Sequence, residues 1–366
     1  MFYHLFTPLI EYHIIFNVFR YITFRAIGAF ITALLFSFFI GPRIIKMLKN
    51  SNATETINEH VPKSHKEKQG TPSMGGLIMI ASILLSTILW NNLINTFILL
   101  LLVTLLWLGG VGFIDDYFKN VLKKKDGLRP KYKLFGQTIL ALVVACAIYF
   151  SPNGSEATII SLPFIKNAFI QLSWFFIPFT LFMVVGTSNA VNLTDGLDGL
   201  AAGLIAFTTF GLGVMAYLKG NYVWAEHLNL NFISESGELT IFMASMIGTT
   251  LGFLWFNTRP AEIFMGDTGS LTMGGLLAVI SIFLQEQLFF AFIGGLFVVE
   301  ALSSILQRYH FKYTRLKYGE GRRLFLKAPL HHHYEMKGIP ESKIVVRMWI
   351  IGILLVAIGI GTLKLR

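Results

Sequence analysis

The chain has 366 residues, of which 54% are hydrophobic and only 14% are charged, and its mean hydropathy is +0.63. Soluble globular domains carry about 25% charged residues, so this balance excludes an ordinary soluble protein. The formal net charge is +10, and the single cysteine, Cys146, excludes an internal disulfide.

The first 25 residues are rich in aromatic side chains and also contain Glu11, Arg20 and Arg25. They lack the basic start and the small-residue cleavage site of a signal peptide. We therefore expect an interfacial helix that leads into the first membrane span.

Ten apolar segments follow, each about long enough to cross a bilayer as a helix. They lie at 26–45, 74–91, 95–114, 133–150, 172–191, 197–218, 238–256, 269–285, 287–307 and 344–364. Barrel strands would alternate apolar and polar residues in segments of about ten, and these segments do not. The sequence predicts an all-α polytopic integral membrane protein of about ten transmembrane helices, with residues 1–366 forming a single domain.

Lysine and arginine are concentrated in alternate loops, which predicts the orientation of the spans. The loops after the first, third, seventh and ninth spans are basic, whereas the opposite loops contain only Lys166 and Lys219. Basic loops face the cytoplasm, so both termini are expected on the periplasmic side. Topology alone explains most of this charge, and the same charge would attract a polyanionic soluble substrate. We expect no nucleic-acid partner.

Five aspartates lie at the predicted cytoplasmic ends of these spans. Asp115 and Asp116 end the third span in GFIDDY, Asp195 and Asp198 lie in NAVNLTDGLDGL, and Asp267 lies in GDTGS. Acids within a membrane protein are costly and usually mark function. Scattered solvated acids would occupy both faces, so their arrangement on one face favours a shared cleft.

The residues around these acids suit phosphate. Glycine permits close approach of the backbone, and the start of a helix offers free N–H groups to an anion. Thr194, Thr268 and Ser270 could simply cap helices, and for GDTGS alone we favour that interpretation. With five acids converging, we favour a site for Mg²⁺-dependent phosphoryl or pyrophosphate chemistry.

A polar helical stripe and a run of histidines also lie towards the predicted cytoplasmic side. Glu300, Ser303, Ser304 and Gln307 recur at the spacing of one helical face, which predicts that they line the same cleft. The serines could equally serve helix packing, whereas a buried Glu300 needs a partner, a neutral form or a hydrated groove.

The run APLHHHYEMKG contains His331, His332 and His333. A Zn²⁺ site is one interpretation, but no cysteine is near and three adjacent side chains do not easily face one ion. Binding of phosphate or sugar groups fits better, and a plain surface loop remains an alternative.

Six motifs together resemble the phospho-N-acetylmuramoyl-pentapeptide transferase family, within the polyprenyl-phosphate N-acetylhexosamine-1-phosphate transferase superfamily. They are FRAI, HKEKQGTPSMGG, GFIDDY, NAVNLTDGLDGLA, GFLWFNTRPAEIFMGDTGS and APLHHHYEMKG. The resemblance runs from about Phe16 to Arg366.

The resemblance implies a multi-pass enzyme of the bacterial inner (cytoplasmic) membrane whose active site faces the cytoplasm. Such an enzyme moves phospho-MurNAc-pentapeptide from UDP-MurNAc-pentapeptide to undecaprenyl phosphate in peptidoglycan biosynthesis. The products are lipid I and UMP, and the cofactor is Mg²⁺. Membrane lipid surrounds the protein, and the family resemblance suggests a homodimer.

The motif matches also imply residue roles. Asp267 would be the Mg²⁺ ligand, and Asp115 and Asp116 the catalytic pair at the lipid phosphate. The uridine and sugar site would be formed by Asn192, Asp195, Asp198, Asn257 and Phe264, and completed by Lys68, Ser73, Gln307, His331, His332 and His333. The loop at 310–325 is longer than is usual in the family, and its tip has no assigned role.

Two other functions are alternatives to this one. The related transferase that uses UDP-GlcNAc to load GlcNAc-1-phosphate onto undecaprenyl phosphate shares the acidic motifs, but APLHHHYEMKG favours the pentapeptide enzyme. A transporter with the acids as an ion path is disfavoured, because the acids lie at one face rather than at the midplane.

The sequence leaves two mechanisms open. One aspartate could attack the donor and form an aspartyl-phosphate, or the lipid phosphate could attack directly. The acceptor is already mostly dianionic at pH 7, which favours direct transfer.

Overall fold

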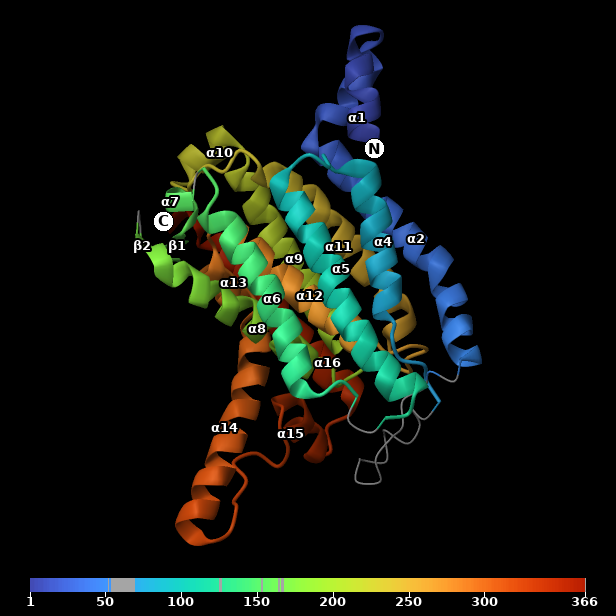
Figure 1. Cartoon of the computed structure of the whole chain (residues 1–366), viewed down its shortest axis with the longest axis vertical. Coiled ribbons are helices and arrows are strands. Elements are labelled where there is room, and N and C mark those ends of the chain that lie inside the picture. Colours follow the sequence, from blue (N-terminus) through green and yellow to red (C-terminus); the bar gives the residue numbers. More distant parts are fainter. Residues whose placement is uncertain are drawn as a thin grey trace.

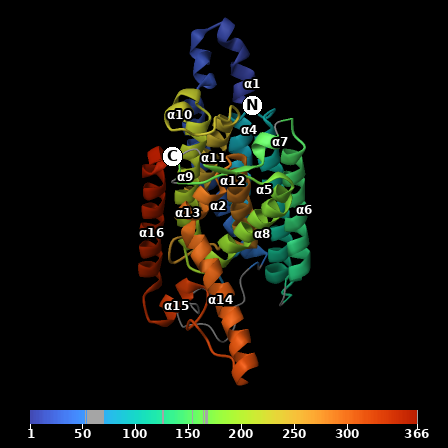
Figure 2. The same cartoon turned by 90° about the vertical axis from the view of Figure 1, so that its left-hand side faces the viewer.

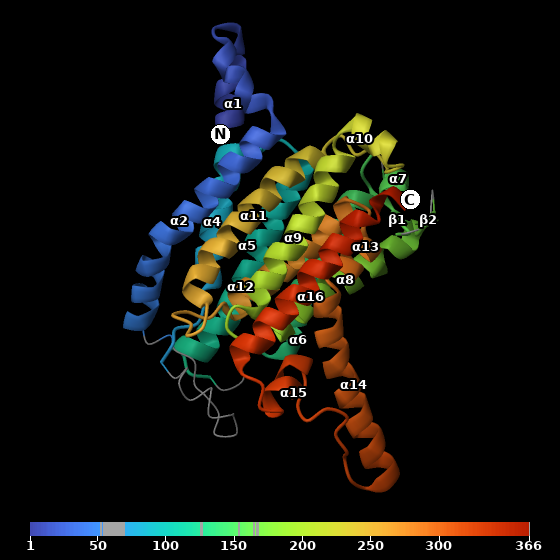
Figure 3. The ribbon, with the colours of Figure 1, turned by 180° about the vertical axis from the view of Figure 1, so that it is seen from behind.

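The computed structural model describes residues 1–51, 53, 70–124, 127–152, 154–163, 165 and 168–365. Long helices run side by side in a bundle, with α14 and α15 at one end and both chain termini towards the other (Figures 1 and 3). The long helices are α2 (Ile22–Asn50), α4 (Gly76–Trp90), α5 (Thr96–Asp116), α6 (Pro130–Tyr149), α8 (Phe176–Thr194), α9 (Leu200–Lys219), α11 (Ser236–Asn257), α12 (Gly266–Phe283), α14 (Gly295–Tyr318) and α16 (Glu341–Gly361).

Shorter elements precede, connect or follow these helices. They are α1 (Phe2–Phe6), η1 (Pro8–Glu11), η2 (Ile14–Arg20), η3 (Tyr117–Val121), α7 (Gly154–Ala157), η4 (Ser173–Phe175), α10 (Tyr222–His227), α13 (Gln287–Ile293), α15 (Leu330–Met336) and η5 (Leu363–Leu365). A two-stranded antiparallel hairpin joins β1 (Ile159–Ser161) to β2 (Phe169–Gln171), with Ile160 opposite Ile170. This hairpin was not predicted, and its strands lie in a connection between two spans.

Local sequence explains where several helices begin and end. Asn95 caps α5, because its side chain accepts a hydrogen bond from Ile98 N–H at 3.2 Å. Pro130 begins α6, at the one position in a helix where its missing N–H costs nothing. Gly319 ends α14 in the left-handed region, at φ +77°.

The all-α membrane prediction is confirmed, and each predicted span overlaps a helix. Among the described residues, eight helices are long and apolar enough to cross a membrane, or nine if the pair α13 and α14 counts as one span. Helix α4 has only 15 residues and is shorter than a usual span.

Two details of the prediction are wrong. The span at 287–307 is not one helix, because α13 and α14 meet at an angle of 82°. The break falls at Gly294, beside Gly295, where the backbone is most easily turned. The N-terminal segment is not one interfacial helix but the three short helices α1, η1 and η2, which extend beyond the bundle (Figure 1).

Helix α12 lies at the centre of the bundle, and 94% of its most apolar 18 residues are buried. It packs mainly against α5 and α8 and also against α4. Two glycines permit close approaches between backbones: a Cβ on Gly76 of α4 would collide with the backbone of Gly269, and a Cβ on Gly112 of α5 would collide with the carbonyl oxygen of Asp267. The start of α12 is thereby held against the end of α5.

Candidate active site

Three aspartates from α5 and α12 meet at one end of the bundle. Asp115 and Asp116 occupy the last turn of α5, and Asp267 occupies the first turn of α12. One oxygen of each carboxylate lies within 4.8 Å of the other two. Asp115 and Asp116 are buried, whereas the Asp267 side chain keeps 13% exposure. The sequence places the two motifs about 150 residues apart, and the fold brings them together.

Two lysines enter this aspartate cluster. Lys119, in η3, lies with its Nζ 2.5 Å from Asp115 Oδ2 and 3.3 Å from Asp267 Oδ2. Lys133, in α6, lies 3.2 Å from Asp115 Oδ2 and also pairs with Asp267. The three carboxylates and two ammonium groups leave a formal excess of one negative charge.

These two lysines are not among the predicted site residues. A signal existed for Lys119, which follows Asp115 by four residues, the spacing of facing side chains on a helix. Lys133 lies at the cytoplasmic start of the next predicted span, but its side chain reaches Asp267, 134 positions away, only through the fold.

Asp116 is bound differently from the other two aspartates. Its Oδ1 accepts a hydrogen bond from Asp267 N–H at 3.1 Å, and its Oδ2 accepts from Thr268 N–H at 2.8 Å and from the Thr268 hydroxyl at 2.6 Å. Asp116 therefore caps the start of α12, where free N–H groups and the helix dipole favour an anion. Gly266 has φ +70°, and a Cβ there would lie 2.6 Å from Asp116 Oδ2, so glycine permits this contact.

Asn192, near the end of α8, fixes the other side of Asp267. Its Nδ2 donates to Asp267 Oδ1 at 2.6 Å and to Ser270 Oγ at 2.8 Å. One oxygen of Asp267 thus accepts from the Asn192 amide, and the other faces the ammonium groups of Lys119 and Lys133. Carboxylate oxygens are hard donors that suit Mg²⁺, so the three aspartates fit the expected ion. Asp115 and Asp267 are the better candidates, because one oxygen of each faces the lysines, whereas both oxygens of Asp116 are held by the start of α12.

Asp198 and Asn257 join the connection after α8 to the connection before α12. Asn257 accepts from Gly199 N–H at 3.0 Å and donates to the Ile263 carbonyl at 2.9 Å. Asp198 Oδ2 accepts from Ala261 N–H at 3.3 Å. Their side chains shape the wall of the site by holding these two connections together.

Two further residues of the predicted uridine site, Asp195 and Phe264, lie on the same connections, and Ser73 lies in the segment before α4. Asp195 follows α8 directly and is half-buried. The backbone of Phe264 donates to the Pro72 carbonyl at 2.9 Å and accepts from Gly75 N–H at 2.8 Å. Ser73, between those two partners, is buried at 5% exposure. Lys68 lies outside the described residues.

The three histidines lie on α15 and have different partners. His331 is fully buried, with its Nδ1 3.1 Å from Glu300 Oε2, so Glu300 has the partner that its burial requires. His332 pairs with Glu335 at 3.0 Å, and His333 accepts from Leu326 N–H at 3.1 Å.

Burial lowers the pKa of the His332 imidazole below its usual value, although Glu335 opposes the shift, so this ring is neutral at neutral pH. The histidine run is thus a structured helix turn, and its side chains do not converge on one ion.

A basic groove of about 480 Å³ lies beside the histidine helix, at the same end of the bundle. Its lining residues come from α8, α14 and the 323–329 segment and include Leu193, Gln307, Arg323, Lys327 and Pro329. Gln307 holds the segment in place, because it accepts from Leu324 and Phe325 N–H and donates to the Phe325 carbonyl. The groove offers cations for an anionic ligand.

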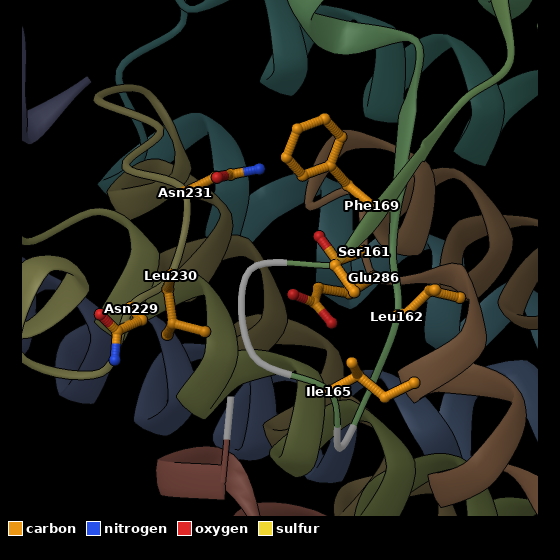
Figure 4. Close-up of a pocket in the computed structure, with 9 residues that line it drawn as sticks. Ser161, Leu162, Ile165, Phe169, Asn229, Leu230, Asn231 and Glu286 are labelled. Carbon is orange, nitrogen blue, oxygen red and sulfur yellow. The ribbon is translucent and has the colours of Figure 1, made fainter.

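A further cavity of about 170 Å³ lies at the opposite end of the bundle, beside the β-hairpin. Figure 4 shows Glu286 and Ser161 directed into it, with Phe169 and Asn231 on its rim. It lies far from the aspartate cluster and contains none of the predicted site residues.

Comparison with known proteins identifies the family. Residues 98–285 match the family model described as glycosyl transferase family 4, a range that includes all five aspartates. A phospho-N-acetylmuramoyl-pentapeptide-transferase of Thermodesulfovibrio yellowstonii is 46% identical over the full length of both chains, and one of Endomicrobium trichonymphae is 47% identical, also over both full lengths. One of Pelodictyon phaeoclathratiforme is 48% identical over 96% of this chain and 95% of its own. The chain therefore belongs to the phospho-N-acetylmuramoyl-pentapeptide transferase family.

Proposed function

We propose that this chain moves phospho-MurNAc-pentapeptide from UDP-MurNAc-pentapeptide to undecaprenyl phosphate, releasing UMP and leaving lipid I in the membrane. The meeting of Asp115, Asp116 and Asp267 at one end of a membrane bundle is the observation that carries this proposal. The shared name of the three relatives supports this donor over UDP-GlcNAc.

Asp267 and Asp115 are the residues that would hold Mg²⁺. When bound, the ion supplies charge neutralisation to pyrophosphate oxygens. Asp116 is a positioning residue in this scheme, because its oxygens hold the first N–H groups of α12 and so fix Asp267. Asn192 fixes the same carboxylate from the side of α8.

Lys119 and Lys133 address the main electrostatic difficulty of the reaction, the approach of two anions. Both ammonium groups lie between Asp115 and Asp267, where they can also neutralise phosphate oxygens. Positioning and charge neutralisation dominate phosphoryl transfer, so two fixed cations at this point serve both purposes.

Direct transfer fits these contacts better than a phospho-enzyme. Both oxygens of Asp116 are engaged by α12, and Asp115 accepts from Leu128 N–H at 2.9 Å while facing the lysines. The acceptor phosphate, mostly dianionic at pH 7, attacks the sugar-linked phosphorus of the donor. A new P–O bond forms, the bond to UMP breaks, and UMP leaves with the electron pair.

The basic groove beside α15 would receive the peptide part of the donor. Its cations, Arg323 and Lys327, suit a substrate that carries carboxylates. A donor without a peptide, such as UDP-GlcNAc, would not use these contacts. The same proposal includes the residues predicted to bind the uridine and the sugar of the donor. They are Lys68, Ser73, Asn192, Asp195, Asp198, Asn257, Phe264, Gln307, His331, His332 and His333.

We also propose that the site faces the cytoplasm from the inner membrane, because the basic loops border the aspartate cluster. The family resemblance further suggests that the protein works as a homodimer.

The donor is tested with purified protein, undecaprenyl phosphate and Mg²⁺. UMP release from UDP-MurNAc-pentapeptide should exceed release from UDP-GlcNAc by at least about a hundredfold, the scale of a few lost charged contacts. Glu226→Gln, at an exposed position of α10 at the other end, is the matched control and should keep both rates. A preference for UDP-GlcNAc would assign the chain to the related GlcNAc-1-phosphate reaction.

A further inference from the structure

Helix α14 leaves the bundle in its second half. After the bend at Gly294 the helix runs for 24 residues and extends past the ends of its neighbours (Figures 1 and 2). Among residues 308–320, only Thr314 is buried. This exposed part includes the tip of the 310–325 loop, to which the proposed reaction assigns no role.

An apolar stripe runs along the exposed half of α14. Leu302, Leu306, Tyr309, Tyr313 and Leu316 recur every three or four residues, which places them on one face. Their exposed fractions range from 48% at Leu302 to 79% at Leu316. A continuous apolar stripe of this length indicates a surface that another apolar phase covers.

Cations border the stripe. Lys312 and Arg315 lie on one side of it, and Lys317 lies on the other, whereas Arg308 lines the basic groove. Arg322 follows in the returning segment. Within residues 301–327, Glu320 is the only acid, so the tip is strongly positive.

The third face of α14 is occupied by its own returning segment. Thr314 accepts a hydrogen bond from Arg322 N–H at 2.8 Å, and Gln307 accepts from Phe325 N–H at 2.8 Å. The His310 ring lies 3.1 Å from the Arg322 carbonyl. The returning segment therefore covers the polar face and leaves the stripe and its cations facing outward.

We propose that residues 302–318 of α14 lie on the membrane surface and bind anionic phospholipids. The stripe enters the boundary between headgroups and acyl chains, where tyrosine is favoured, and the cations contact lipid phosphates. A second copy of the chain is a poorer occupant, because it would bring the same cations together. This inference does not depend on the donor or on the reaction.

The test measures how deeply the stripe enters the bilayer. Leu316→Cys, in a Cys146→Ser background, carries an environment-sensitive fluorophore on protein reconstituted into vesicles. We expect quenching by spin-labelled lipid to be strong in an equal mixture of phosphatidylcholine and phosphatidylglycerol. It should be weaker in phosphatidylcholine alone, and added salt should weaken it in the mixture.

A charge-removing variant identifies the contacts. Changing Lys312, Arg315, Lys317 and Arg322 to Gln should weaken the binding of α14 to the membrane. The ratio of membrane-bound to free α14 should fall by about fivefold per cation, on the order of several hundredfold in all. The matched control changes Lys46, Lys49, Lys343 and Arg347 to Gln, which removes the same charge from exposed positions elsewhere and should leave the quenching intact.

Two outcomes would overturn the inference. One is a failure of the charge dependence, seen either as equal, salt-insensitive quenching in the two kinds of vesicle or as equal loss of quenching in both quadruple variants. The other is energy transfer between labels at position 316 on different copies that persists as protein density falls, since that would make a second copy the occupant.

Discussion

The two ends of the bundle bury charge in two different ways. At the end near the β-hairpin, Lys219 and Glu286 are fully buried and form a balanced pair, with Nζ 3.0 Å from Glu286 Oε1 and 2.6 Å from the Leu284 carbonyl. At the other end, the aspartate cluster holds three carboxylates against two lysines and keeps part of Asp267 exposed.

This difference separates a structural use of charge from a chemical one. A balanced pair without solvent exposure joins the end of α9 to the segment after α12, and it leaves no net charge for a ligand. An unbalanced, partly open cluster has carboxylate oxygens in excess and access from solvent. Substitutions at the two ends should therefore change different measurements.

The largest expected effect is on turnover, in Asp267→Asn. The amide keeps the size of the side chain but removes the charge proposed to hold Mg²⁺, so UMP release should fall by about a thousandfold or more. The melting temperature of the purified protein should change little. Near-normal turnover at ordinary Mg²⁺ concentrations would contradict the assignment.

Glu286→Gln should show the reverse pattern. Removing one partner leaves Lys219 charged in a buried place, which lowers the free energy of unfolding by about 3–5 kcal/mol. Turnover per folded molecule should be unchanged. Thermal unfolding measures the loss, and the double variant Lys219→Met with Glu286→Leu should recover most of it. A Glu286→Gln protein that is stable but inactive would place this pair in the reaction.

Gly112→Ala tests whether the cluster needs the close approach of α5 and α12. The added Cβ meets the Asp267 carbonyl oxygen and should displace the carboxylates relative to each other. A displacement of this kind can reduce turnover by about a hundredfold. Gly110→Ala is the matched control, because a Cβ there meets no atom within 4 Å. Equal rates in the two variants would show that the spacing is not critical.

Thr268→Val makes a smaller change, at the cap of α12. It removes the hydroxyl that donates to Asp116 but keeps the backbone N–H that also donates to it. One lost hydrogen bond costs about 1 kcal/mol. Because Asp116 is proposed to position Asp267, turnover should fall by roughly fivefold. Thr272→Val is the control, since its hydroxyl bonds only to the carbonyl of Thr268. A loss as large as that of Asp267→Asn would indicate that Thr268 itself contacts substrate.

The last prediction is the absence of a reaction. Radiolabelled UMP, UDP-MurNAc-pentapeptide and Mg²⁺ are incubated with rigorously delipidated protein. Direct transfer has no half-reaction without the lipid, so no label should enter the nucleotide sugar. Exchange in a sample with measured, negligible lipid would make one of the two adjacent aspartates a nucleophile.

Much of this architecture follows from the sequence. Runs of apolar residues locate the spans, because a bilayer requires long uncharged helices. Short-range motifs locate Asp115, Asp116 and Asp267. The role of Asp116 as a cap on α12 could not be predicted, since its partners are 151 and 152 positions away. The break at Gly294 was missed because hydropathy does not change across it.

The burial of α12 has a consequence for how the protein enters the membrane. Its hydropathy of 1.3 is the lowest of the eight candidate spans, compared with 2.6 for the span formed by α5. It begins with GDTGS, and an aspartate within a helix opposes insertion from the translocon. Helix α12 should therefore insert poorly alone, and its entry should depend on α5 and α8, which precede it during synthesis and surround it in the folded protein.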